Sequence, residues 1–209
     1  MISEKLIPYL VKSICEFWDM PAFTDYPGIA LNYSDVGKRI MWMHRLFTAS
    51  GIKKGSKIAL AGKNCSAWAL TWVSSVTYGA TIVPILANFS PEDTQHIINH
   101  CDAELLFISK DKFDSIDCDA LRKVAYVFSL DDFTLLKNRV NLDSELVPSL
   151  QNTPELLNLN KEAMIVPDNC DNEDIAAIIY TSGTTGFSKG VMLPHRSLLA
   201  NLIVARENL

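Results

Sequence analysis

KIALAGKNCSAWALTWVSSVTYGATIVPIL, residues 57–86, is the stretch that decides the fold class. Its two ends, Lys57–Ala61 and Thr81–Leu86, are short apolar runs of the kind found in buried strands. Between them Ser66–Tyr78 has the length of a helix, and Gly79 follows where a helix would end. A strand, a helix and a strand with short connections predict a right-handed crossover between two parallel strands.

The residues that follow continue this alternation. Pro91–Cys101 is a predicted helix that Ser90 opens, and two further strands are predicted over Glu104–Ser109 and Val124–Phe128. The pattern predicts an α/β fold whose core, residues 55–130, is a parallel βαβ sheet covered by helices.

The residues before this core predict two helices and a pair of short strands. Apolar residues recur at helical spacing over Ser3–Asp19, and the strands are expected over Ala22–Asp25 and Ile29–Tyr33. A second helix follows, for which Ser34 is the predicted N-cap and Gly51 the residue that ends it.

The C-terminal third divides into an irregular part and an ordered part. Residues 138–174 lose periodicity and are rich in Asn, Pro, Asp and Glu, which indicates an irregular connector. Residues 175–209 predict a strand, a loop, a second strand and a helix, and the helical pattern of Ser197–Leu209 runs to the last residue. We therefore expect the chain to be part of a longer protein, and the resemblance described below implies that it is the N-terminal part.

Composition excludes several classes of protein. The 209 residues carry a net charge of −5 with scattered basic residues, which disfavours nucleic acid as a partner. Five cysteines without a CxxC motif favour free thiols in the cytoplasm over disulfides or a zinc site. Residues 64–91 contain no charged residue, but Ser, Thr, Gly and Pro interrupt them, so a buried helix and strand are favoured over a membrane span.

YTSGTTGFSKG, residues 180–190, is the candidate functional stretch. It lies between two predicted strands, Ile175–Tyr180 and Val191–Leu193. Its hydroxyls, its glycines and the ammonium group of Lys189 are the donors that a polyphosphate requires. A polar hairpin loop without a ligand is the alternative. A Walker A loop is excluded by spacing, because Ser188 precedes the lysine and a strand follows where that motif needs a helix.

Two longer stretches carry a resemblance to a known family. YTSGTTGFSKGVMLPHRSLLAN, residues 180–201, closely resembles the phosphate-binding signature of the adenylate-forming (AMP-binding) superfamily, YTSGTTGxPKGVxxTH. Residues 55–109 resemble its early helix–strand region, and VPILANFSPEDTQHIINHCDAELLF, residues 83–107, looks most like long-chain fatty acyl-CoA synthetases. The resemblance implies the N-terminal part of the adenylate-forming fold, with the phosphate loop on strands of a second sheet. Ser188 departs from the usual proline, which loosens the loop without removing a phosphate-contacting position.

The resemblance also implies an activity. Members of this family activate a carboxylate with ATP and Mg²⁺, release pyrophosphate, and pass the acyl group from the acyl-adenylate to a thiol such as coenzyme A. One threonine, Thr181 or Thr184, is a candidate for holding Mg²⁺. No catalytic residue is assigned, because the family's metal-binding acid, ribose-binding aspartate and late lysine lie further along its members' chains. The residues expected to bind the ATP phosphates are Thr181, Ser182, Gly183, Thr184, Thr185, Gly186 and Lys189.

The expected function is therefore that of a long-chain-fatty-acid–CoA ligase, with the 209-residue chain alone inactive. The alternatives are an adenylation domain that activates an amino or aryl acid for a carrier protein, and a non-catalytic nucleotide-binding module. The expected partners are a fatty acid and coenzyme A. We further expect contact with a membrane surface but no transmembrane span, and self-association of the isolated chain, whose mean hydropathy is +0.12.

Three kinds of residue outside the loop have competing interpretations. His96 and His100 stand four residues apart on a predicted helix, where a place on the helix surface is favoured over metal binding. His195 is expected to orient the loop or cap the last helix rather than to act in acid–base chemistry. The four tryptophans are expected in the core: Trp18, Trp42, Trp68 and Trp72.

Overall fold

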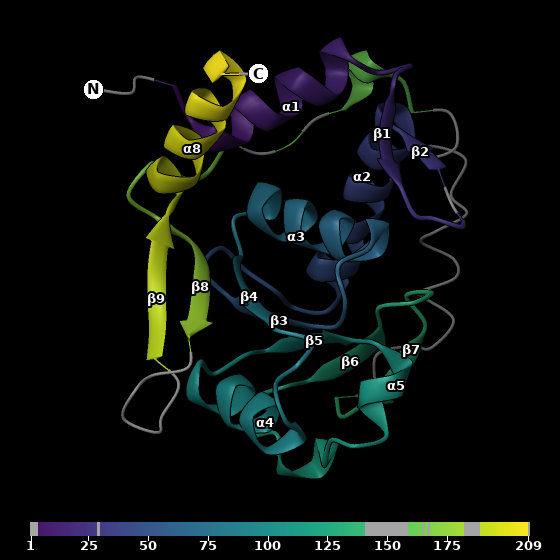
Figure 1. The fold of residues 1–209 in the computed structure, drawn as a ribbon, viewed down its shortest axis with the longest axis vertical. Coiled ribbons are helices and arrows are strands. Elements are labelled where there is room, and N and C mark those ends of the chain that lie inside the picture. Colours follow the sequence, from purple (N-terminus) through teal and green to yellow (C-terminus); the bar gives the residue numbers. More distant parts are fainter. Residues whose placement is uncertain are drawn as a thin grey trace.

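A mixed seven-stranded sheet forms the centre of the computed structural model, which describes residues 4–28, 30–140, 159–164, 166, 168–181 and 189–208 (Figure 1). The strand order is β7-β6-β5-β3-β4-β8-β9, with the two edge strands antiparallel to their neighbours and the others parallel. The strands are β3 (Lys57–Ala61), β4 (Thr81–Ile85), β5 (Leu105–Ile108), β6 (Tyr126–Ser129), β7 (Leu135–Asn138), β8 (Ile175–Thr181) and β9 (Lys189–Pro194).

Helices cover both faces of this sheet. Figure 1 shows α2 and α3 on one side and α4 and α5 on the other, with α8 lying beside α1. A separate antiparallel pair, β1 (Pro21–Thr24) and β2 (Ala30–Asn32), lies next to α2. The helices are α1 (Leu6–Glu16), α2 (Tyr33–Ala49), α3 (Ser66–Tyr78), α4 (Pro91–His100), α5 (Lys110–Phe113) and α8 (His195–Asn208), with short 3-10 turns at Cys118–Ala120 and Lys161–Ala163.

The alternation of side chains along β3 explains the two layers. Ile58 and Leu60 are buried against the α2 and α3 layer, whereas Ala59 and Ala61 are buried against the α4 layer. Successive side chains of a strand point to opposite faces, so a strand that is apolar at every position belongs between two layers of helices. This arrangement confirms the predicted α/β class.

Local signals place α3 where the sequence predicts it, at both ends. The Cys65 thiol accepts a hydrogen bond from the Trp68 amide in the first turn. At the other end Gly79 has a φ of 87°, the left-handed conformation that ends a helix. The stretch without charged residues is thus divided between this helix and β4. None of the helices in the described ranges combines the length and apolar content that a membrane crossing requires.

Three expectations are wrong in detail. The strands that carry the loop, β8 and β9, do not form a second sheet but extend the same sheet beyond β4. Strand β7 is present although no strand was expected there. The α2 N-cap is Asn32, two residues before the expected Ser34, because Asn32 and Asp35 form a reciprocal capping box.

The tryptophans lie in or against the core, as expected. Trp42 is buried, and Trp18, Trp68 and Trp72 are half-buried and pack on the α2 and α3 layer. Of the expected connector, the structure describes 159–164, 166 and 168–174, where the 3-10 turn is the one regular element.

Candidate functional site

The stretch singled out in the sequence begins and ends in a β-hairpin. Strands β8 and β9 are antiparallel, and the register pairs closest to their connection are Tyr180 with Gly190 and Thr181 with Lys189. Residues 182–188 join the two strands. Five of the predicted phosphate-binding residues lie in this connection and outside the described residues: Ser182, Gly183, Thr184, Thr185 and Gly186.

The connection starts from the carboxyl edge of the parallel sheet. Strand β8 is parallel to β4, so Thr181 stands at the same edge as the carboxyl end of β4. Ligands of open α/β sheets bind outside this edge. Thr181 and Lys189, the two described members of the predicted site, are paired across the hairpin and exposed. A hydroxyl and an ammonium group are thereby brought side by side where an anion can reach both.

Below this exposed pair, the Tyr180 side chain anchors the end of β8. Tyr180 is 3 % exposed and packs in the layer between the sheet and α4. Its hydroxyl lies 2.6 Å from Nδ1 of His100, the last residue of α4, and the two rings meet edge to face. Burial raises the pKa of Tyr180 to about 12, so the hydroxyl keeps its proton at neutral pH.

Gly190, which faces Tyr180 across the hairpin, leaves room for that ring. A Cβ atom at this position would lie 2.9 Å from Ile178 Cγ2 and 3.1 Å from Tyr180 Cζ. Both distances are shorter than ordinary van der Waals contact, so the side chains of β8 cover β9 at this point because residue 190 is a glycine.

The other end of the hairpin is fixed by separate contacts. The Thr81 hydroxyl donates to the Ile175 carbonyl at 2.8 Å, and Lys54 forms an ion pair with Asp174 at 2.7 Å. The amide of His195 donates to the Asp174 carbonyl at 3.0 Å. His195 is 2 % exposed, and burial lowers its pKa.

His195 therefore starts α8 at the end of β9 that is remote from the loop. Strand β9 separates the two by its whole length, on the order of 20 Å at the usual rise per residue. His195 is the first residue of α8, whereas the sequence predicts that it precedes this helix. Its place at this end of β9 gives no support to the expectation that it orients the loop, whose residues 182–188 lie outside the described part of the chain.

The two histidines of α4 have no metal-binding surroundings in the described part of the chain. The rings of His96 and His100 lie 5.6 Å apart, but no group of three or more His, Cys, Asp or Glu residues that could hold a metal ion is found there. His100 contacts Tyr180 instead, a role that its place in the sequence does not reveal.

Comparisons with known proteins show the family of this chain. The family described as AMP-binding enzyme matches residues 12–208, which is nearly the whole chain. The chain belongs to the AMP-binding enzyme family. The matched residues include both strands of the hairpin, β8 and β9.

The relatives of this chain are named for different acids. It is 33 % identical over 169 residues to a crotonobetaine/carnitine–CoA ligase of Proteus mirabilis, covering 80 % of this chain and 31 % of the relative. It is 26 % identical over 219 residues to a long-chain-fatty-acid–CoA ligase of Escherichia coli. This match covers 95 % of this chain and 38 % of the relative. The chain thus spans about a third of the length of the curated relatives that it matches.

A solved structure shows the same fold. The anthranilate CoA ligase AuaEII, bound to anthranoyl-AMP, superposes with a TM-score of 0.73 at 17 % identity, covering 92 % of this chain and 34 % of that one. At this level of identity the likeness concerns the fold alone. It confirms the predicted N-terminal part of the adenylate-forming architecture.

Proposed function

We propose that this chain supplies the ATP-phosphate-binding wall of an acid–CoA ligase. The full-length enzyme would join a carboxylate to ATP, release pyrophosphate, and transfer the acyl group from the adenylate to coenzyme A. The observation that carries the proposal is the pairing of Thr181 with Lys189 at the carboxyl edge of the sheet, where it brackets the glycine-rich connection.

The chemistry of these residues suits the leaving group of that reaction. Negative charge grows on the β- and γ-phosphates as pyrophosphate departs, and donors already in place lower the barrier. Lys189 would supply the charge, and Thr181 one hydroxyl. The remaining donors would come from Ser182, Gly183, Thr184, Thr185 and Gly186.

Magnesium fits this donor set as a partner of ATP. Mg²⁺ binds proteins through few side chains and keeps several water and phosphate oxygens, so one threonine hydroxyl is a suitable ligand. Thr181 or Thr184 would provide it, and the ion would neutralise phosphate charge.

A long-chain fatty acid is the substrate that we propose first. The support is the sequence similarity to long-chain acyl-CoA synthetases. The alternative is an aryl or amino acid, which the anthranilate ligase of the same fold illustrates. A panel of fatty, aryl, amino and betaine-type acids, assayed by hydroxylamine trapping of the adenylate, would distinguish them in the full-length protein.

The 209-residue chain alone would have no ligase activity. The metal-binding acid, the ribose-binding aspartate and the adenylate-contacting lysine that the resemblance implies would lie further along the full-length chain. A purely nucleotide-binding role is the non-catalytic alternative, and it would show as ATP binding without carboxylate-dependent exchange by the full-length protein.

Contact with a membrane surface and a reducing compartment remain part of the proposal, the latter because all five cysteines are free.

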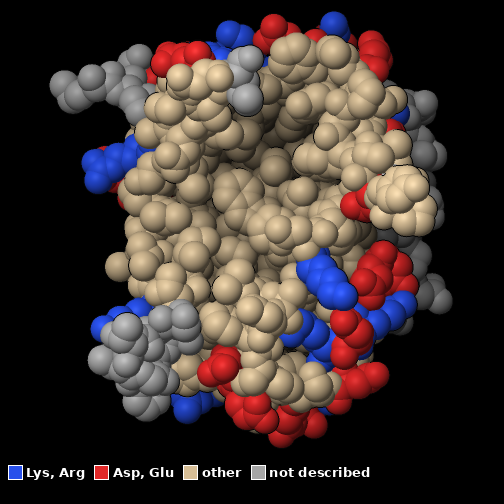
Figure 2. Space-filling view, viewed as in Figure 1, with Lys and Arg blue, Asp and Glu red and all other residues tan. Residues whose placement is uncertain are grey.

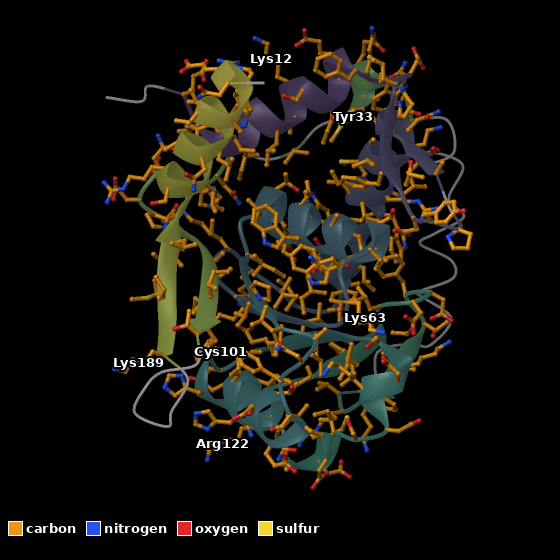
Figure 3. The ribbon with its side chains drawn as sticks, viewed as in Figure 1. Lys12, Tyr33, Lys63, Cys101, Arg122 and Lys189 are labelled. Carbon is orange, nitrogen blue, oxygen red and sulfur yellow. The ribbon has the colours of Figure 1, made fainter. Side chains whose placement is uncertain are left out.

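Lys189→Met tests the proposed function most directly. Removing the ammonium group should lower the rate of carboxylate-dependent ATP–pyrophosphate exchange about 100-fold, since a lost charge contact to the leaving group costs about this much. Lys12→Met is the matched control, because Lys12 is exposed on α1, far from the hairpin in Figure 3. Equal rates for Lys189→Met and the wild type would refute the proposal.

A further inference from the structure

His100 touches the hairpin although it lies 80 residues away from it in the sequence. Its Nδ1 atom and the Tyr180 hydroxyl are 2.6 Å apart, a short hydrogen bond. Figure 3 places Cys101, the next residue, near the end of the hairpin at which Lys189 lies. The contact joins α4 to the last residues of β8 before the connection.

The end of α4 that carries His100 is packed against the sheet by its neighbouring residues. Ile97 and Ile98 of α4 are fully buried against the sheet. Cys101 follows as the helix C-cap and is itself buried. Because α4 is packed along this side, the backbone of its last residue is held against the sheet, and the exposed His100 side chain is positioned by its hydrogen bond to Tyr180.

The restraint passes from Tyr180 to the exposed pair through the backbone. Tyr180 directly precedes Thr181, and it is in register with Gly190, which directly follows Lys189. Alternation along the strands turns the Tyr180 ring toward α4 and the side chains of Thr181 and Lys189 toward the opposite face. A shift of the Tyr180 ring would therefore move both described members of the phosphate site.

We propose that His100 is a positioning residue for ATP, which fixes Tyr180 and through it the placement of Thr181 and Lys189. This inference rests on the proposed function. A residue of α4, outside the glycine-rich stretch, would thus help to position the groups that bind the phosphates. His100 itself would touch neither ATP nor the carboxylate.

Two substitutions remove the hydrogen bond from either side in the full-length natural protein. His100→Leu removes the ring nitrogen, and Tyr180→Phe removes the hydroxyl while keeping the buried ring. Each should raise the KM for ATP about three- to tenfold, the effect of one lost hydrogen bond, and leave the KM for the carboxylate unchanged. The double variant should be no worse than either single one, because both remove the same interaction.

A conservative variant and a control separate positioning from general stability. His100→Asn keeps a polar amide near the site of Nδ1 and should restore the wild-type KM for ATP. Gln95→Leu removes a polar side chain from the same helix, on the side that faces Ser115 and Arg122, and should change nothing. If His100→Leu lowers the melting temperature, the positioning role is judged from Tyr180→Phe and His100→Asn instead. The KM for ATP and the KM for the carboxylate are then measured for these two variants.

The outcomes distinguish the two proposals. If Lys189→Met abolishes exchange while His100→Leu and Tyr180→Phe keep the wild-type KM for ATP, the positioning role is overturned and the proposed function stands. A parallel rise in both KM values would also overturn it, because a general structural defect does not select ATP. Full activity of Lys189→Met would overturn the proposed function itself.

Discussion

His44 is a buried titratable residue on the α2 and α3 layer. It is 7 % exposed, and its Nε2 atom lies 3.1 Å from the Ser74 carbonyl and 3.0 Å from the Thr77 hydroxyl. A carbonyl oxygen only accepts, so the ring donates from Nε2 in its neutral form. Burial lowers the pKa of His44 to about 4, which makes its protonation unfavourable in the folded state.

Acid should therefore weaken the fold through His44. Its folded pKa lies below the unfolded value of about 6.5, so its contribution to stability is complete above pH 6.5 and is lost as pH falls toward 4. Between pH 8 and pH 5 the free energy of unfolding should fall by on the order of 2 kcal/mol, measured by urea titration of the 209-residue chain.

His44→Gln should remove most of this pH dependence, whatever its effect on stability at pH 8. His195→Asn is measured beside it, because His195 is also buried and has a lowered pKa. Its protonation in acid therefore also lowers the free energy of unfolding. The aspartates with lowered pKa values, such as Asp102 and Asp174, act only nearer pH 4. A pH dependence unchanged by His44→Gln would contradict this assignment.

At the scale of elements, a side-chain hydrogen bond supplements the backbone pairing of β8 with β4. One register pair, Ile82 with Ala177, links β4 to β8. The Thr81 hydroxyl adds a hydrogen bond to the Ile175 carbonyl at 2.8 Å, and Thr81 is 4 % exposed. A side chain thus supplements the backbone ladder at the point where the site hairpin joins the parallel strands.

Thr81→Val should lower the free energy of unfolding by about 1–2 kcal/mol, because it removes the donor and keeps the shape. Thr94→Val is the matched control. Thr94 is 1 % exposed on α4, and its hydroxyl has no hydrogen-bond partner among the described residues, so a methyl group there should be neutral or stabilising. Urea titration compares the two, and equal losses would contradict the role of the Thr81 hydroxyl.

The elements themselves could be predicted where their signals are local. The bounds of β3 and α3 match the sequence expectation because their signals lie within or beside them. Strand β3 is an apolar run, and α3 lies between its N-cap Cys65 and the glycine that ends it, Gly79. Sheet order could not be predicted in this way, since the pairing of β4 with β8 joins residues far apart in the chain. The same reason hides His100, whose partner Tyr180 lies beyond the connector.

At the scale of the whole molecule, one broad surface is almost free of charge. Figure 2 shows it hollowed at its middle and bordered by charged residues, in the view where α3, α8 and the site hairpin face the reader. The edge strand β9 itself carries two exposed apolar side chains, those of Val191 and Met192, which are 48 % and 65 % exposed. An exposed apolar edge strand offers unpaired backbone groups to a second chain.

The isolated 209-residue chain should therefore self-associate at high concentration. Met192→Lys places a charge on this edge and should shift the sedimentation profile toward the monomer. Val140→Lys is the control, because Val140 is 63 % exposed next to β7, at the opposite edge of the sheet. A wild-type chain that sediments as a monomer at every concentration would contradict this expectation.

The pairing of Thr181 with Lys189 also bears on two kinds of evolutionary constraint. The ladder of the hairpin ends at this pair, so the fold depends on residues up to Thr181 and from Lys189 onward. The seven positions between them contribute no pair to the ladder as the described residues define it. Under the proposed function, Thr181 and Lys189 serve the strand ladder and the phosphates at once, so selection for foldability and selection for nucleotide chemistry would coincide at this pair.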